Sequence, residues 1–262
     1  MNKWKYRLKT FLQYKDLIVE LVSRDIKLKY RRSFLGYVWS ILNPLLIMIV
    51  MTVVFSAMFQ RNIDNYPVYL LIGRMTFEFM TTSTNAAMKS VTGNAALLKK
   101  TYIPKYIFTI SKVTSCFIDF IFSLGALLIV MVFTRAPFYP TMFLFPYVII
   151  QLYLFCVGLG FLLAALNVFF RDITYIYRAV TTAWMYLTPI FYPIEQLPAG
   201  LIMAIKLANP LYYYVAQLRD LIMRGRFPGP RLFWGGWLFA FIMVVIGVRV
   251  FEKHKDEFIL YI

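Results

Sequence analysis

Histidine and cysteine are scarce in this chain of 262 residues, which contains one histidine and two cysteines. The sequence therefore offers no metal-ligand cluster and no Ser/His/Asp or Cys/His arrangement of the kind that nucleophilic catalysis needs. Cys116 and Cys156 both lie inside apolar runs, where we expect them to act as small hydrophobic residues without forming a disulfide or metal framework. His254 lies in the polar tail and is expected to be solvated.

Acidic residues are also few, 12 against 28 lysines and arginines, which gives a formal net charge of +16. In a soluble protein this excess would suggest a nucleic-acid partner, but here the basic residues cluster at the ends of apolar runs. That placement indicates cytosolic loops and anionic lipid headgroups instead. A nucleotide site is also missing, because residues 93–101 lack the glycine that precedes the lysine of a phosphate-binding loop. The first 34 residues are too polar and basic for a cleavable signal peptide.

Apolar residues dominate what remains: 61% of the chain is hydrophobic, and the mean hydropathy is +0.67. They gather in runs long enough to cross a bilayer, which needs roughly 20 residues each. We therefore expect an all-α integral membrane protein, with a transmembrane domain over residues 35–262 and both termini in the cytosol. The expected spans cover about residues 34–59, 66–88, 106–133, 141–170, 175–191 and 232–250.

The segment 1–34 is predicted to form an amphipathic helix that lies along the membrane surface, because it is too polar to span. Its apolar residues recur at helical spacing: Phe11, Tyr14, Leu17, Ile18, Leu21 and Val22. Its basic residues anchor this end in the cytosol. We expect a group of them to contact lipid phosphates as well: Arg24, Lys27, Lys29, Arg31 and Arg32.

Residues 94–105 form a short basic turn between the second and third expected spans, with no acidic residue. Two interpretations stay open: an ordinary positively charged loop, or a docking element on which a cytosolic partner pushes. The residues that would couple the chain to that partner are Leu97, Leu98, Lys99, Lys100, Tyr102, Ile103 and Pro104.

The segment 192–231 lies between the last two expected spans and contains two short apolar pieces, residues 201–208 and 211–223. Neither piece is long enough to cross a bilayer. Two short helices that enter the outer leaflet and return would fit this pattern, provided that protein buries their turn.

Several polar side chains lie within the expected spans, where charge is costly in lipid. Arg74 and Glu78 are four residues apart, share a helix face and can pair, either as a structural salt bridge or beside a water-filled path. Asp119 lies deep in its span and needs a partner from another helix, whereas Lys112 is expected to extend its amine to the cytosolic interface. Aromatic residues are candidates for a path that tolerates sugar rings, although membrane-interface belts are an alternative: Tyr37, Trp39, Trp184, Tyr186 and Tyr192.

Four segments together resemble a known family. Residues 24–44 read R-D-I-K-L-K-Y-R-R-S-F-L-G-Y-V-W-S-I-L-N-P, residues 97–105 read L-L-K-K-T-Y-I-P-K, Phe170-Arg171-Asp172 follows the fourth span, and Asn209-Pro210 lies in the last outer loop. The pattern resembles the ABC-2 type permeases that export polysaccharides and polyol phosphates. It is most similar to the O-antigen polysaccharide export permeases, followed by those for teichoic acid and capsule.

The resemblance implies a homodimer in the inner membrane that is not itself an enzyme and carries no cofactor. ATP and Mg²⁺ would be bound by two copies of a separate cytosolic ABC ATPase, docked on residues 94–105 and on the N-terminal helix. A glycan linked to undecaprenyl pyrophosphate would pass between the first and fifth spans of the two subunits, and the short outer helices would form an exit gate. Two other classes stay open: an ion- or proton-coupled carrier that depends on Glu78 and Asp119, and a membrane enzyme acting on lipid-linked sugars. The enzyme would need a cluster of catalytic acids that the sequence lacks.

Overall fold

The computed structural model of the chain describes residues 12–31, 34–59 and 63–262. These residues are mainly α-helical and none of them belongs to a β-strand, which confirms the predicted all-α class. Two of the expected spans, α4 (Tyr66–Met88) and α6 (Tyr106–Phe133), begin and end at the predicted residues. The other long helices are α3 (Trp39–Phe59), α7 (Phe145–Phe169), α8 (Ile173–Leu187) and α11 (Pro230–His254).

Two of these helices begin later than predicted because a tighter turn precedes them. The turn η1 (Gly36–Val38) leads into α3, and η4 (Pro140–Leu144) leads into α7. Proline favours the first turn of a helix, where its missing N–H costs nothing, and Pro140 begins η4 in this way.

Four helical segments of the described residues are long and apolar enough to cross a membrane: Gly36–Phe55, Tyr106–Phe133, Pro140–Phe169 and Pro230–His254. Two of the six predicted spans do not meet these criteria. The helix α8 has only 15 residues, and α4 carries an ion pair and a run of hydroxyl side chains. The polarity of α4 has a physical reason, because most of its residues are buried against protein.

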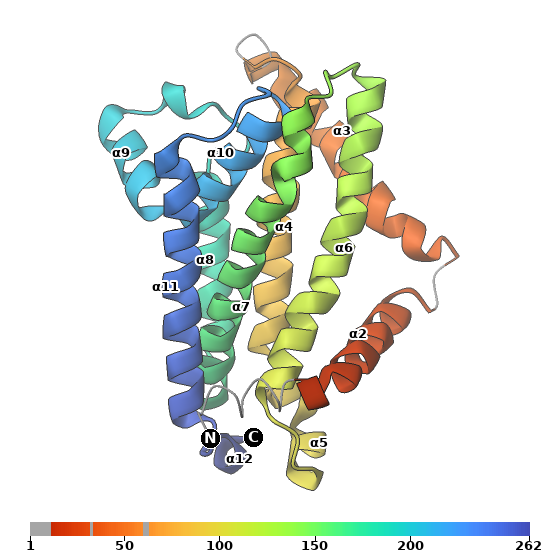
Figure 1. The fold of residues 1–262 in the computed structure, drawn as a ribbon, viewed down its shortest axis with the longest axis vertical. Helices are drawn as coiled ribbons and strands as arrows, with labels where there is room; N and C mark the ends of the chain where they lie inside the picture. The colour runs from red at the N-terminus through yellow and green to blue at the C-terminus, as the bar shows by residue number, and fades with distance from the viewer. Residues whose placement is uncertain (1–11, 32–33, 60–62) are drawn as a thin grey trace.

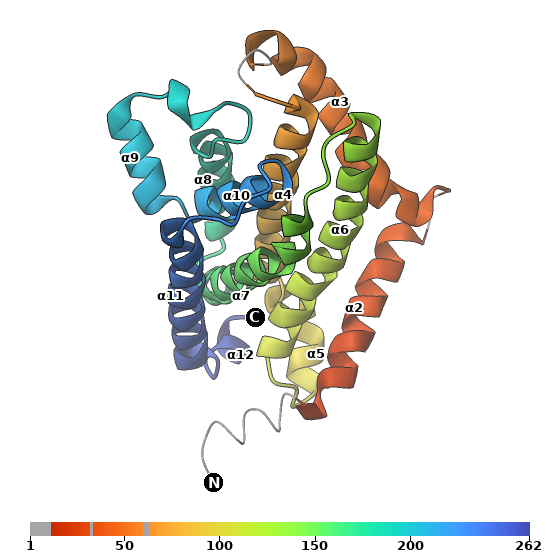
Figure 2. The same ribbon diagram turned by 45° about the horizontal axis from the view of Figure 1, so that its top comes forward.

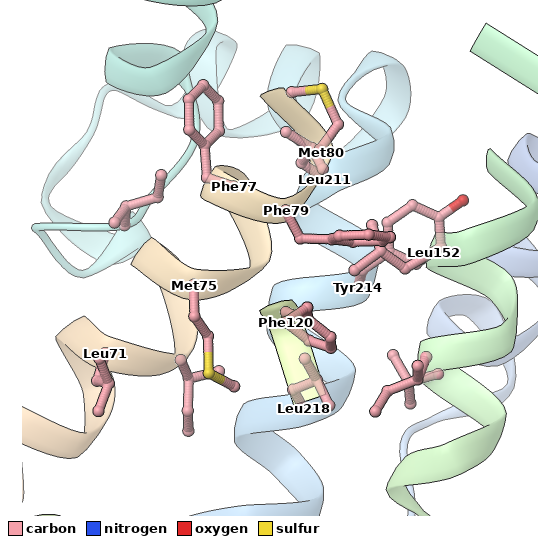
Figure 3. Close-up of a cluster of buried hydrophobic side chains, with 14 of the residues drawn as sticks. Leu71, Met75, Phe77, Phe79, Met80, Phe120, Leu152, Leu211, Tyr214 and Leu218 are labelled. Carbon is pink, nitrogen blue, oxygen red and sulfur yellow. The ribbon is translucent and has the colours of Figure 1, made fainter. Parts of the chain in front are cut away.

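The main hydrophobic core is built around α4, which packs against α3, α6, α7, α8 and α10. In Figure 3, Phe79 of α4 lies among side chains from three other helices. Its ring centroid is 5.0 Å from that of Phe120 on α6, and Leu152 and Tyr214 come from α7 and α10. This core fixes the central helix relative to its neighbours.

Close packing of α7 and α11 depends on glycine at the points where the two helices meet. A Cβ atom on Gly158 would overlap the backbone of Met243, and a Cβ on Gly247 would overlap the carbonyl group of Gly158. The two helix backbones therefore touch, and neither position has room for a side chain.

The short helices gather at the two ends of the bundle (Figure 1). At one end lie α5 (Ala95–Lys100), preceded by η3 (Thr92–Asn94), and α12 (Phe258–Tyr261). At the other end lie α9 (Ala199–Ala208), preceded by η5 (Ile194–Gln196), and α10 (Pro210–Ile222). The two predicted outer pieces are therefore helical. Asn209 caps α10, because its side-chain oxygen accepts a hydrogen bond from the Leu211 N–H at 3.1 Å.

The predicted amphipathic helix is present as α2 (Lys15–Tyr30), and its apolar residues Ile18, Leu21 and Val22 are buried. The predicted Phe11 lies outside the described residues. Rather than standing apart from the spans, α2 packs along α6 (Figure 2). Its buried face joins a second hydrophobic cluster that includes Leu98 of α5.

Candidate functional site

The loop between α4 and α6 has one buried side and one exposed side. Leu98 is 4% exposed and packs into the second hydrophobic cluster, so it anchors α5 and is not available to a partner. This differs from its predicted place among the coupling residues. Leu97, Ile103 and Pro104 are half-buried. The exposed side includes Lys99, Lys100, Thr101 and Tyr102.

The end of this loop is tied to the C-terminal segment. The Lys105 ammonium donates a hydrogen bond to the backbone oxygen of Lys255 and lies 5.7 Å from the ring centroid of Phe258. Burial lowers the pKa of Lys105, and the carboxylate of Asp256 opposes that shift. The exposed residues therefore stand on a support formed by α2, α6, α7 and α12.

Two ion pairs join α2 to α6. The Lys29 ammonium is 2.7 Å from the carboxylate of Asp119, which confirms that Asp119 finds a partner on another helix. The Lys112 ammonium is 2.8 Å from the carboxylate of Asp25. The interface position of Lys112 stays a prediction, and the sequence did not reveal that α2 brings the Asp25 carboxylate beside it.

The other predicted lipid contacts are less constrained. Arg24, Lys27 and Arg31 are exposed, although Arg24 also lies 3.5 Å from the carboxylate of Asp25. Arg32 lies outside the described residues. A lipid-binding role for these side chains stays a prediction.

The two ion pairs should contribute unequally to the docking of α2. The side chains of Lys112 and Asp25 are 28% and 13% exposed, whereas those of Lys29 and Asp119 are 55% and 25% exposed. Solvent screens the second pair more strongly, so we expect coupling energies of about 1–2 kcal/mol for the first pair and about 0.5 kcal/mol for the second. Double-mutant cycles with Lys→Met and Asp→Asn, followed by unfolding in detergent, measure both. The reverse order would contradict the structure.

A cavity of about 750 Å³ lies between α2, α3, α4 and α6. Both ion pairs line it, together with Glu78 and with the aromatic rings of Trp39, Phe79 and Phe120. Further lining comes from hydroxyl and amide side chains: Ser40, Asn43, Thr82, Ser115 and Ser123. A wall of this mixture suits a hydroxyl-rich ligand better than a purely apolar one.

The sequence left two roles open for the polar residues of α4, a structural salt bridge or the wall of a water-filled path, and the structure contains features of both. The Arg74 guanidinium lies 3.7 Å from the Glu78 carboxylate, which confirms the predicted pair. Thr84 shares a hydrogen bond of 2.7 Å with the Tyr177 hydroxyl of α8, so it joins two helices. Thr82 and Glu78, by contrast, face the cavity. The polarity of α4 is therefore partly structural and partly accessible from the cavity.

The predicted aromatic residues fall into two groups. Trp39 begins α3 and Tyr37 lies in η1 just before it, where the Tyr37 ring centroid is 6.3 Å from that of Phe122 on α6. Tyr186 lies at the end of α8 and is exposed, and the half-buried Tyr192 follows it. Figures 1 and 2 both place α4 between α3 and α8, so one subunit does not bring the two groups together.

Trp184, predicted as a residue of the sugar path, forms a hydrogen bond that joins two segments of the fold. Its indole N–H donates to the Asn209 side-chain oxygen at 2.9 Å, and the Asn209 amide donates to the Thr188 hydroxyl at 3.0 Å. The Asn209-Pro210 motif thus ties the end of α8 to the start of α10. Sequence spacing gives no sign of this contact, because the two segments are joined by a long loop.

One set of candidate residues was missed. The exposed face of α8 carries Tyr175, Arg178, Thr182 and Tyr186, which recur at helical spacing on one side of the helix. An arginine on an exposed helix face normally meets protein or water, because its charge is costly in lipid. Helical spacing could have predicted this face, because residues 175, 178, 182 and 186 lie on a different side of the helix from the buried Tyr177 and Thr181.

Comparisons with known proteins give a consistent picture. The family model described as "ABC-2 type transporter" matches residues 16–223. An "O-antigen export system permease protein RfbA" from Myxococcus xanthus is 29% identical over 248 residues, which cover 94% of this chain and 95% of the relative. A protein of the same name from Klebsiella pneumoniae is 28% identical over 260 residues, covering 98% and 97%. A "Capsule polysaccharide export inner-membrane protein CtrC" from Neisseria meningitidis is 22% identical over 203 residues, 74% of each chain.

Proposed function

Because this chain belongs to the ABC-2 type transporter family, we propose that it is the membrane permease of an exporter that moves O-antigen polysaccharide across the inner membrane. Relatives named as O-antigen export permeases align with it over nearly their whole length and over nearly all of this chain. That full coverage favours O-antigen over the capsule, whose named relative aligns over a shorter region. A teichoic acid or capsular glycan is the alternative cargo.

ATP is hydrolysed by a separate cytosolic ABC ATPase, present in two copies, and this chain receives the force. The observation that carries this proposal is the loop at residues 94–105, where Lys99, Lys100 and Tyr102 are exposed on a buried support. An exposed tyrosine on a rigid base is well suited to anchor a protein interface, and the two lysines would complement an acidic partner surface. A push on this surface would reach α6 directly, since α6 begins at Tyr106.

The chain crosses the membrane six times, with α4 and α8 as the second and fifth crossings and both termini in the cytosol. Burial by the neighbouring helices allows α4 to cross despite its charges. The short helices α9 and α10 enter the outer leaflet and return, and they form the exit gate. The separation of α5 and α12 from α9 and α10 at opposite ends supports this orientation.

Two copies of the chain form the path for the glycan. Within one subunit the aromatic start of α3 and the stripe on α8 lie on opposite sides of α4. A homodimer would let α3 of one copy face α8 of the other, and the stripe Tyr175, Arg178, Thr182 and Tyr186 would then line the path. The lipid anchor, undecaprenyl pyrophosphate, would stay at the inner leaflet near the basic residues of α2.

An ion-coupled carrier is less well supported. Such a carrier normally needs a relay of ionisable groups that change their protonation. The two carboxylates that the sequence placed within the spans, Glu78 and Asp119, are instead engaged by Arg74 and Lys29.

Co-purification tests the proposed function. The chain is expressed together with the ABC ATPase gene of its genome neighbourhood, extracted in mild detergent and purified by a tag on this chain. We expect the ATPase to remain bound at one copy per permease, and its hydrolysis rate to respond to lipid-linked O-antigen. The proposal would be contradicted if the ATPase were lost during mild purification, or if its rate of ATP hydrolysis did not change when lipid-linked O-antigen was added.

A further inference from the structure

A second cavity, of about 460 Å³, lies at the end of the molecule opposite α5. Four segments enclose it: the start of α4 with the residues before it, the loop after α6, residues 189–195 and the helix α10. Its volume falls within the range of about 300–1,000 Å³ that is typical of small-molecule sites. We refer to it as the outer pocket.

The base of the outer pocket is held by one buried arginine. The guanidinium of Arg219, on α10, donates hydrogen bonds to the backbone oxygens of Pro189 at 2.7 Å, Ile190 at 3.1 Å and Tyr69 at 3.2 Å. Its central carbon lies 3.3 Å from the ring centroid of Tyr69. Gly73 makes this possible, because a Cβ there would lie 2.9 Å from the Arg219 Nη2. The base therefore joins three of the four segments.

The charged side chains that line the pocket balance one another, with Asp64 and Glu195 against Arg219 and Arg224. Arg219 is committed to carbonyl groups, and the Arg224 guanidinium is 2.8 Å from the carboxylate of Asp220. Asp64 and Glu195 are exposed, line the pocket and form no ion pair within the part of the chain that the structure describes. A lining with balanced charges favours a neutral ligand, and the two exposed carboxylates favour one that donates hydrogen bonds.

Aromatic faces complete the lining. The rings of Tyr139 and Tyr212 enter it from the loop after α6 and from α10. The Tyr139 ring lies against Gly225, whose φ of +60° and missing side chain allow that approach. Tyrosine rings present apolar faces on which the C–H side of a sugar ring can pack, and carboxylates accept hydrogen bonds from its hydroxyls. Among the described residues no group of three or more metal ligands exists, which argues against a bound cation.

We propose that the outer pocket binds a neutral sugar residue of the emerging glycan, with Asp64 and Glu195 accepting hydrogen bonds from its hydroxyl groups. This inference rests on the proposed export function. Since the pocket is built partly from residues 189–195 and α10, a bound sugar would contact the segments that form the proposed gate. The pocket would then act as an exit subsite, separate from the cavity between α2 and α6.

Saturation-transfer NMR on the permease–ATPase complex in lipid nanodiscs tests the proposal. The probes are the methyl glycosides of glucose, mannose, galactose and N-acetylglucosamine, with glycerol 3-phosphate as the anionic comparison. We expect at least one glycoside to bind, and the double variant Asp64→Asn/Glu195→Gln to bind it at least about tenfold more weakly. The matched control is Asp16→Asn/Glu20→Gln, which changes two exposed carboxylates on α2 and should leave binding unchanged.

Three results would overturn the inference: no glycoside binds, the double variant binds as well as the wild type, or glycerol 3-phosphate binds in preference to every glycoside. The same preparations in proteoliposomes report ATP-driven export. Export that requires the ATPase, together with any of those three results, would reject the outer pocket as a sugar subsite and leave the proposed function standing. Export without the ATPase would reject the proposed function itself.

Discussion

Replacing Lys99 and Tyr102 by alanine is expected to reduce glycan export at least about tenfold while the permease remains folded. Both side chains are exposed, and the Tyr102 side chain makes no contribution to the core, with a relative exposure of 104%. Their removal should therefore leave the unfolding temperature of the permease unchanged. The measurement is ATP-driven export by proteoliposomes, normalised to the ATP hydrolysed.

Two further variants separate coupling from folding. Leu98→Ala removes a side chain that is 4% exposed, so it should destabilise the permease by about 2–4 kcal/mol and lower export through loss of folded protein. Lys253→Ala changes an exposed lysine at the end of α11 and should affect neither the stability of the permease nor its export rate. Export by Lys99→Ala/Tyr102→Ala at the wild-type rate would show that the loop is only a positively charged connection.

The second large effect is expected at Gly247. A leucine there would place its Cβ on the carbonyl group of Gly158, and backbone atoms cannot move aside as a flexible side chain can. The helices α7 and α11 would have to separate along their contact, which we expect to cost on the order of 5 kcal/mol and to leave little folded protein. The yield of monodisperse permease on size-exclusion chromatography measures the outcome.

A glycine elsewhere gives the matched comparison. Gly200 in α9 has no heavy atom within 4 Å of the position that a Cβ would occupy, so Gly200→Leu should be tolerated. Equal yields of the Gly247→Leu and Gly200→Leu permeases would show that the close contact between α7 and α11 is not required for folding.

Sequence reasoning succeeded where local signals decide the structure. The bounds of α4 and α6 follow from apolar length and from the prolines and polar residues at their ends. The pair Arg74–Glu78 follows from helical spacing alone. Spacing alone could not predict which residues of the loop at 94–105 are exposed and which are buried. The burial of Leu98 depends on packing against α2, α7 and α12.

Contacts between distant segments were beyond the reach of spacing. Nothing local indicates that α2 lies along α6, so the sequence did not predict that Lys112 pairs with Asp25. The same limit hid the bond between Trp184 and Asn209 and the burial of Arg219. The helix α4 also falls short of the hydropathy expected of a membrane span. Hydropathy counts residue types only, whereas in the structure the neighbouring helices cover most residues of α4.

The central claim is that this chain forms the path for the glycan and receives the force at residues 94–105, while a different subunit hydrolyses ATP. Export from proteoliposomes tests it most directly, with lipid-linked O-antigen in the outer leaflet of vesicles whose permease presents α5 to the bath. We expect uptake only when the ABC ATPase and Mg-ATP are both added, and none when a proton or sodium gradient replaces them. Uptake by the permease alone on an ion gradient would contradict the account.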